Sequence, residues 1–100
     1  MVNRRAAIEA ALRRLAPRLP GHEFGAVIDH ALGSAGLRQA APEAAAWLSL
    51  VAYARHVFTG YDELLEEGYD PDSARFFVLH ELNEALRGWG VRREVGGDEG

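Results

Sequence analysis

Six polar residues with the functional groups of a catalytic site occur between residues 55 and 75: Arg55, His56, Thr59, Tyr61, Asp62 and Arg75. A histidine can take a proton as a general base, tyrosine and aspartate can exchange protons, and a guanidinium can hold an anion. If the chain is an enzyme, we expect its catalytic residues to be His56, Tyr61, Asp62 and Arg75. A general base must lie within about 3 Å of the proton that it takes, and spacing along the chain does not establish that distance.

The same residues also fit structural roles at a junction between helices. Thr59 followed by Asp62 is a variant of the capping box, with Asp in place of Glu, and Asp70 before Pro71 is a second helix start. Arg75 falls within the apolar arc of the last predicted helix, where an unpaired charge is unfavourable. We therefore expect a structural ion pair, first of all between Arg75 and Asp62. A side chain of Arg75 that reaches water, or that binds a ligand, stays open as an alternative.

His56 lies in the last turn of a predicted helix, where the helix dipole favours a protonated imidazole. Its expected partners are a carbonyl group at the helix end, Tyr61 or Asp62. The structural interpretation is a partly covered histidine that closes the junction, beside a tyrosine whose hydroxyl is hydrogen-bonded.

A second group, His80-Glu81-x-x-Glu84, half-resembles the zinc-binding helix motif in which two histidines at i and i+4 share one face. Glu84 replaces the second histidine, so we interpret His80 and Glu84 as a surface pair. The glycines occur at expected helix ends and form no phosphate-binding loop. We therefore predict neither a metal site nor a cofactor.

The elements that must position these residues are five predicted helices separated by Gly and Pro. The first is capped by Asn3 and ends before Pro17; the others cover about residues 22–32, 42–58, 61–67 and 71–87. The helix over 42–58 is apolar on one side and small on the other, which is typical of a helix packed on both sides. The predicted fold class is all-α, a compact bundle of about five helices around this central buried helix.

Composition indicates one domain of 100 residues with an ordinary hydrophobic fraction of 48%. We predict a single helical domain over residues 1–90 and a flexible tail over 91–100, because the tail has few apolar groups to bury. The chain has no cysteine, which excludes disulfides and fits a reducing compartment. No apolar run approaches the roughly 20 residues that cross a bilayer, and the first residues lack a secretory signal pattern. We therefore expect a cytoplasmic protein without a membrane partner.

Charge is distributed unevenly along the chain. Residues 1–20 hold five Arg and one Glu, a balance of +4, whereas residues 59–85 hold eight carboxylates and one Arg, a balance of −7. One alternative function is therefore nucleic-acid binding, with an affinity that falls steeply with salt, through Arg4, Arg5, Arg13, Arg14 and Arg18.

Two adjacent aromatic residues favour a different function. Phe76 falls on the polar side of the last predicted helix and Phe77 on its border. An exposed aromatic pair indicates an interface, unless the short acidic helix folds over both rings. The favoured function is a non-enzymatic interaction module that binds a protein partner or a second copy of itself. Its contacts are Phe76 and Phe77, or the polar junction through Arg55 and His56.

The chain resembles a bacterial family of proteins, domain-of-unknown-function family 2293. The resemblance covers roughly residues 10–93 and rests on "RHVFTGYDELL", "SAR" and "LRGWG". The matching positions are Arg55, His56, Thr59, Tyr61, Asp62, Leu64, Leu65, Ala74, Arg75 and Trp89. The resemblance implies no assigned activity. Longer members that carry such a domain beside Arg-rich segments point slightly toward nucleic acid.

Overall fold

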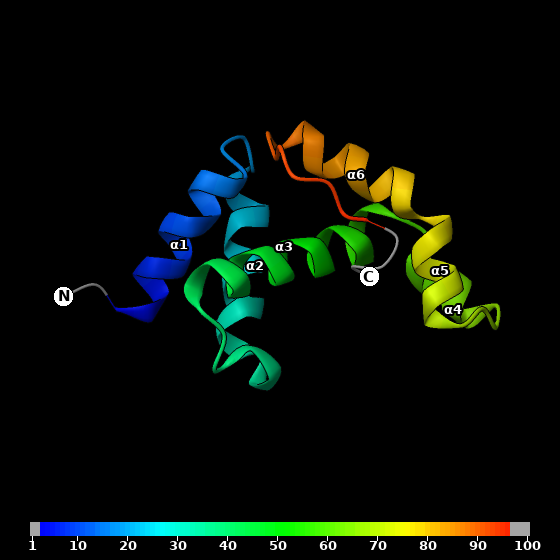
Figure 1. Ribbon diagram of the computed structural model, residues 1–100, viewed down its shortest axis with the longest axis horizontal. Helices are drawn as coiled ribbons and strands as arrows, with labels where there is room; N and C mark the ends of the chain where they lie inside the picture. Colours follow the sequence, from blue (N-terminus) through cyan, green and yellow to red (C-terminus); the bar gives the residue numbers. More distant parts are fainter. Residues whose placement is uncertain (1–2, 97–100) are drawn as a thin grey trace.

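Helices account for all of the regular secondary structure in the computed structural model, which describes residues 3–96 (Figure 1). The elements are α1 (Arg4–Leu15), α2 (Gly21–Gly33), the 3-10 turn η1 (Ala35–Leu37), α3 (Pro42–Phe58), α4 (Tyr61–Glu66), α5 (Pro71–Phe77) and α6 (Leu79–Gly88). The all-α class is confirmed. None of the helices in this part of the chain is long and apolar enough to span a bilayer.

Helix α3 occupies the centre, where it packs against α1, α2 and α6 (Figure 1). Its apolar side buries Leu50 and Ala54 completely, and its small side buries Ala45 and Ser49 completely. Small side chains let neighbouring helices approach α3 closely on that side. The predicted central helix is therefore confirmed, including the inference that both of its sides are covered.

Helix α1 is held at its start by two kinds of contact. The side chain of Asn3 accepts a hydrogen bond of 2.8 Å from the backbone N–H of Ala6, which is the predicted cap. Arg4 donates to the backbone carbonyls of Leu37 and Ala40, each at 2.8 Å. These bonds tie α1 to the connection that leads into α3, so Arg4 fixes the fold near the N-terminus.

The last helix differs from the sequence-based prediction, because the segment 71–87 is two helices that meet at Val78. Val78 has φ −100° and ψ 5°, outside the helical region, although its backbone still bonds to Ala74 and Leu82. Helix α5 packs on α4, whereas α6 turns Leu82 and Leu86 toward the core beside α3. One straight helix cannot serve both neighbours, and the break at the buried Val78 lets each half pack separately.

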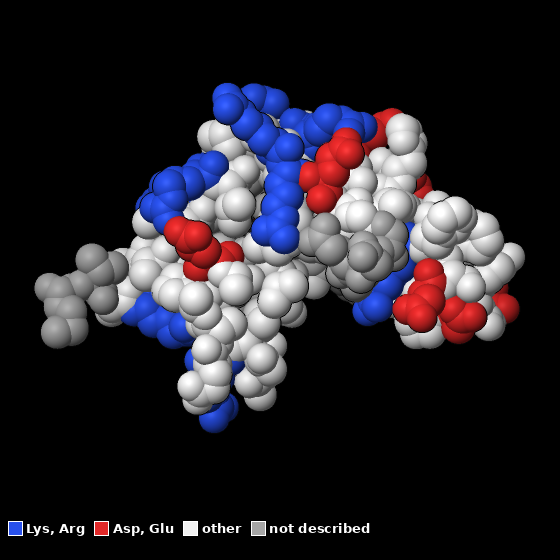
Figure 2. All heavy atoms as spheres, in the orientation of Figure 1, with Lys and Arg blue, Asp and Glu red and all other residues white. Residues whose placement is uncertain are grey.

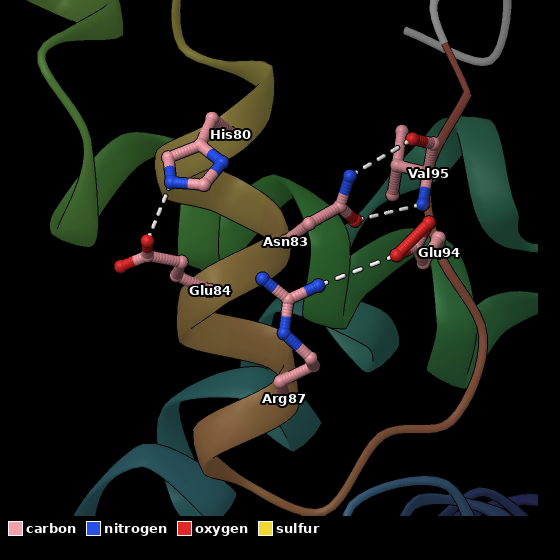
Figure 3. Close-up of polar contacts among 6 residues, drawn as sticks. All are labelled: His80, Asn83, Glu84, Arg87, Glu94 and Val95. Atoms are coloured by element: carbon pink, nitrogen blue, oxygen red, sulfur yellow. Dashed lines mark hydrogen bonds and ion pairs between the residues drawn. The ribbon is translucent and has the colours of Figure 1, made fainter.

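The tail was predicted to be flexible from residue 91, and for residues 91–96 this is wrong. Val91 and Val95 belong to the hydrophobic core, with 4% and 3% of their surfaces exposed. The side-chain amide of Asn83 donates to the Val95 carbonyl at 3.0 Å and accepts from the Val95 N–H at 2.8 Å (Figure 3). Arg87 contacts Glu94 at 3.3 Å beside this pair. Residues 97–100 of the predicted tail lie outside the described residues.

The overall shape is elongated, with principal extents of 46 × 28 × 23 Å. Helices α4 and α5 lie at one end, beyond the C-terminal end of α3 (Figure 1). We call this part, residues 61–77, the acidic lobe, because it holds six carboxylates and one arginine. The polar residues of the sequence analysis lie where this lobe joins the bundle.

Candidate functional site

Thr59 makes the turn between α3 and α4. Its hydroxyl donates to the backbone carbonyl of Arg55 and accepts from the N–H of Tyr61 at 3.2 Å. Helix α4 begins after Gly60, and this N-cap residue has no side chain that could cap the helix. The predicted capping box of Thr59 and Asp62 is therefore wrong: the Thr59 hydroxyl accepts from the N–H of Tyr61 and not from that of Asp62.

Asp62 pairs with His56, not with Arg75. The contact joins His56 Nδ1 to Asp62 Oδ2 across the turn, and both side chains are substantially exposed. Arg75 instead lies near Asp72, with Nη1 and Oδ1 3.9 Å apart and the Asp72 side chain 98% exposed. Such a long, solvated contact contributes little. The expected Arg75–Asp62 ion pair is thus wrong, and one of the partners expected for His56 is confirmed.

Arg55 is the buried charge of the junction, with only 8% of its surface exposed. Its guanidinium carbon lies 5.6 Å from the centre of the Tyr61 ring, a cation–π contact. Burial lowers the pKa of Arg55, and the positive charge of Arg75 lowers it further, whereas Tyr61 has the opposite effect. Among the described residues, neither Arg55 Nε nor Arg75 Nε, both buried, has a hydrogen-bond partner.

Asp70 starts α5 as predicted. Its carboxylate accepts from the backbone N–H of Ser73 at 2.7 Å and from the Ser73 hydroxyl at 3.2 Å, and Pro71 occupies the first helical position. These hydrogen bonds lower the pKa of Asp70. The role of Asp70 is therefore to position the acidic lobe.

The aromatic pair of the sequence analysis is exposed. Phe76 and Phe77 show 67% and 58% of their surfaces to solvent, so the alternative in which the short acidic helix covers both rings is wrong. Phe77 contacts Tyr69 edge-on at 5.5 Å and Phe76 at 5.9 Å between ring centres. The three rings therefore contact one another while the rings of Phe76 and Phe77 stay exposed.

Beside Phe77 lies an open groove of about 820 Å³ between the end of α3, α4 and the α5–α6 break. We call it the aromatic groove; its lining residues are Val57, Phe58, Thr59, Gly60, Glu63, Leu64, Phe77, Val78 and Glu81. Val57 and Phe58 are also about half exposed. The lining of the groove therefore combines apolar side chains with the two carboxylates Glu63 and Glu81.

The five arginines of the N-terminal region do not form one binding face. Arg4 binds loop carbonyls, Arg5 pairs with Glu9 at 3.4 Å, and Arg13 lies 5.0 Å above the ring of Phe24. Arg14 pairs with Glu43 at 3.3 Å and lines a cavity together with Arg92 and Arg93, and Arg18 bonds to the backbone at the end of α6.

These arginines form a basic face that the sequence analysis missed: Arg14, Arg18, Arg87, Arg92 and Arg93. Arg18 donates to the Arg87 carbonyl at 3.1 Å, and Arg14, Arg92 and Arg93 line a shallow cavity of about 360 Å³. Figure 2 shows basic side chains gathered over the α1–α2 connection and the end of α6. The adjacent arginines Arg92 and Arg93 could have indicated this face in the sequence. They were not used because the tail was predicted to be flexible, and a flexible segment has no fixed position.

The four residues of the enzyme alternative are divided among separate contacts. His56 pairs with Asp62, Tyr61 lies under Arg55, and Arg75 faces Asp72. They do not form one hydrogen-bonded set in the described structure, so no chemical step can be derived from them.

A histidine–serine contact was also missed: His30 Nδ1 lies 3.1 Å from the Ser49 hydroxyl. Ser49 is completely buried and cannot meet a substrate, so this contact joins α2 to α3. The predicted surface pair of His80 and Glu84 is confirmed at 2.5 Å (Figure 3). Within residues 3–96 no group of three or more His, Cys, Asp or Glu side chains is placed to hold a metal ion.

Comparison with known proteins finds one family, described as "Uncharacterized conserved protein (DUF2293)", which matches residues 11–90. The matched range includes the whole polar junction and the aromatic groove, and it confirms the resemblance inferred from the sequence. Neither a curated protein nor a solved structure gives a significant match.

Proposed function

The chain belongs to the DUF2293 family, whose description assigns no activity, so we propose its function from geometry: a protein-interaction module. The aromatic groove would bind an apolar segment of a partner protein. The observation that supports this most directly is the exposure of Phe58 and Phe77, which line a groove of about 820 Å³, and of Phe76, whose ring contacts Phe77. Aromatic residues are enriched in interface cores, and contiguous exposed apolar surface marks interaction sites.

The charge around the groove favours a basic partner. Glu63 and Glu81 line it, and the acidic lobe beside it holds six carboxylates against one arginine. Figure 2 shows acidic side chains on this lobe. A two-fold dimer would place the same acidic patch against itself, and like charges across an interface are unfavourable. We therefore infer a partner segment with an apolar stripe and arginine or lysine flanks.

Two synthetic helical peptides test this proposal. Both carry leucines at i, i+3, i+4 and i+7; one has arginine on its polar face and the other has glutamate. We expect the arginine peptide alone to bind, as measured by fluorescence anisotropy. The double substitution Phe76→Ser and Phe77→Ser should weaken its binding about tenfold or more, because buried aromatic anchors dominate binding energy.

The matched control is Leu32→Ser, which changes another exposed apolar residue, on α2 and outside the groove. It should leave binding unchanged. Equal binding of the two peptides, or undiminished binding to the double variant, would rule out this site. Analytical ultracentrifugation of the protein alone completes the test. If the unaltered protein is a dimer and the double variant is a monomer, a second copy of the chain occupies the groove, and the proposal of a basic partner is wrong.

A second candidate function, nucleic-acid binding, is favoured by the basic face. Glu43 and Glu94 each contact one of its arginines at 3.3 Å, but these pairs are exposed and a phosphate can compete with them. Neutralisation of about five phosphates predicts an affinity that falls about 500-fold between about 50 and 200 mM salt.

Filter binding of a mixed-sequence DNA duplex tests this second candidate. The double substitution Arg18→Glu and Arg92→Glu should abolish retention at low salt, whereas Arg38→Glu, an exposed arginine in the α2–α3 connection, should reduce it only slightly. Failure of the unaltered protein to retain duplex at low salt would eliminate this function.

A further inference from the structure

The cavity of about 360 Å³ on the basic face is lined by three arginines, Arg14, Arg92 and Arg93. None of the described acidic residues belongs to its lining, and the remaining lining residues are Leu15, Pro17, Gly90 and Val91. Cavities of this size are large enough for a small ligand. The lining combines positive charge with apolar side chains, which suits an anion that carries an organic group.

The walls of this cavity are fixed by close packing between two turns. The α1–α2 connection and the turn after α6 touch at Pro17 and Gly90: a Cβ atom at Gly90, which has φ +87°, would lie 2.9 Å from Pro17 Cγ. Across the same contact, the backbone N–H of Arg18 donates to the Trp89 carbonyl at 2.9 Å. The two buried valines of the tail lie on either side of the tail arginines. A site that is already in place loses little freedom when a ligand binds.

The three arginines are held in different ways. Arg92 is exposed, and the half-exposed to fully exposed pair of Arg14 and Glu43, with 64% and 80% of their side chains in solvent, has a contact of 3.3 Å. An exposed ion pair of this kind contributes little, so an anion of higher charge can compete for Arg14. The guanidinium carbon of Arg93 lies 4.2 Å from the centre of the Trp47 ring, which fixes its position.

We propose that this cavity binds a phosphate monoester group, either at the end of a nucleic-acid strand or on a small organic molecule. A monoester carries between about one and a half and two negative charges near neutral pH, whereas a phosphodiester or a carboxylate carries one. Several guanidiniums around one cavity therefore attract the monoester more strongly. The planar donor fork of arginine also suits bidentate contact with phosphate oxygens.

The shape of the site favours the same ligand. A phosphate at the end of a molecule can enter a cavity, whereas the phosphates within a duplex lie along its outer surface. The apolar walls, Leu15 and Pro17 among them, can contact the group to which the phosphate is attached. This inference goes beyond the second candidate function, and it does not rest on it, because a monoester site needs no binding along a duplex.

Isothermal titration calorimetry at constant ionic strength and about pH 8, where a monoester is dianionic, compares phenyl phosphate with methyl phenyl phosphate. The two probes carry the same ring, and only the first is a monoester. We expect saturable binding of phenyl phosphate, about tenfold or more tighter than that of the diester. Equal binding of the two probes, or no saturable binding of phenyl phosphate, would overturn the proposal.

Substitutions at exposed positions locate the binding. Arg14→Gln and Arg92→Gln should each weaken phenyl phosphate binding about tenfold. The matched control Arg38→Gln removes an exposed arginine from the α2–α3 connection and should leave binding unchanged. Glu43→Gln should strengthen binding about two- to fivefold, because it removes the carboxylate that contacts Arg14. Undiminished binding to both arginine variants, or weaker binding to Glu43→Gln, would contradict this site.

A short single-stranded DNA with either a 5′-phosphate or a 5′-hydroxyl group identifies the source of the monoester. Tighter binding of the phosphorylated strand, lost in Arg14→Gln, would assign it to a strand end. Equal binding of both strands, with phenyl phosphate still bound, would assign it to a small molecule. The second candidate function is judged separately on a duplex with 5′-hydroxyl ends. Binding of phenyl phosphate without retention of this duplex supports the cavity and eliminates that function, and the reverse result overturns the cavity alone.

Discussion

Replacing both tail valines, Val91→Ala and Val95→Ala, is expected to lower the free energy of unfolding by about 3 kcal/mol. Each substitution removes two buried methyl groups, worth about 0.8 kcal/mol apiece, and any cavity that remains adds to the loss. Both valines belong to the core that also contains Ile8 and Trp47. Urea denaturation followed by circular dichroism measures the change, which should appear as a lower midpoint at an unchanged slope.

The control for this prediction lies in the same segment. Arg92 and Glu94 lie between the two valines and are exposed, so Arg92→Ala and Glu94→Ala should each change stability by about 0.5 kcal/mol or less. If the two valine substitutions changed stability as little as these controls, residues 91–96 would not be packed against the hydrophobic core. The basic face would then lose Arg92 and Arg93 as fixed members.

Leu50→Ala is expected to lower the free energy of unfolding by about 2–5 kcal/mol, because Leu50 lies at the centre of α3 with none of its surface exposed. Its side chain belongs to the cluster in which α1, α2 and α6 meet α3. The neighbouring helices are held by their own packing and cannot collapse fully into the space. Chemical denaturation in urea again provides the measurement.

The same substitution two residues away provides the comparison for Leu50. Leu48 is on α3 as well, but 48% of its surface is exposed, so Leu48→Ala should lower stability by about 1 kcal/mol or less. Because both changes have the same effect on helix propensity, their difference isolates burial. Equal losses at the two positions would contradict the central placement of α3.

The positions of the helices could be predicted because their signals are local. The side chains of Asn3 and Asp70 each accept a hydrogen bond from the backbone N–H three residues further on, at the two positions where the sequence predicted helix caps. The two packed sides of α3 follow from the spacing of large and small residues along one helix. The exposure of Phe76 and Phe77 follows from the same periodicity, and so does the surface pair of His80 and Glu84.

The junction was predicted only in part, because Arg75 was assigned to the wrong surface. A continuous last helix would place Arg75 on the apolar stripe of Leu82 and Leu86, where a carboxylate partner is needed. The break at Val78 separates α5 from that stripe, and Asp62 turns to His56, which is closer along the chain. The break at Val78 depends on which helix each half of the segment packs against. The spacing of residues within the segment therefore does not predict it.

The amino-acid sequence by itself determined the all-α class, the helix starts, the central helix and the exposed aromatic pair, because caps and periodicity act within one or two turns. Only the tertiary structure decided that Val95 returns to the core and carries Arg92 and Arg93 to Arg14 and Arg18. It alone also buried Arg55 against the ring of Tyr61 and paired Asp62 with His56. These arrangements depend on contacts between residues far apart in the chain, where the packing of the whole bundle determines which side chains meet.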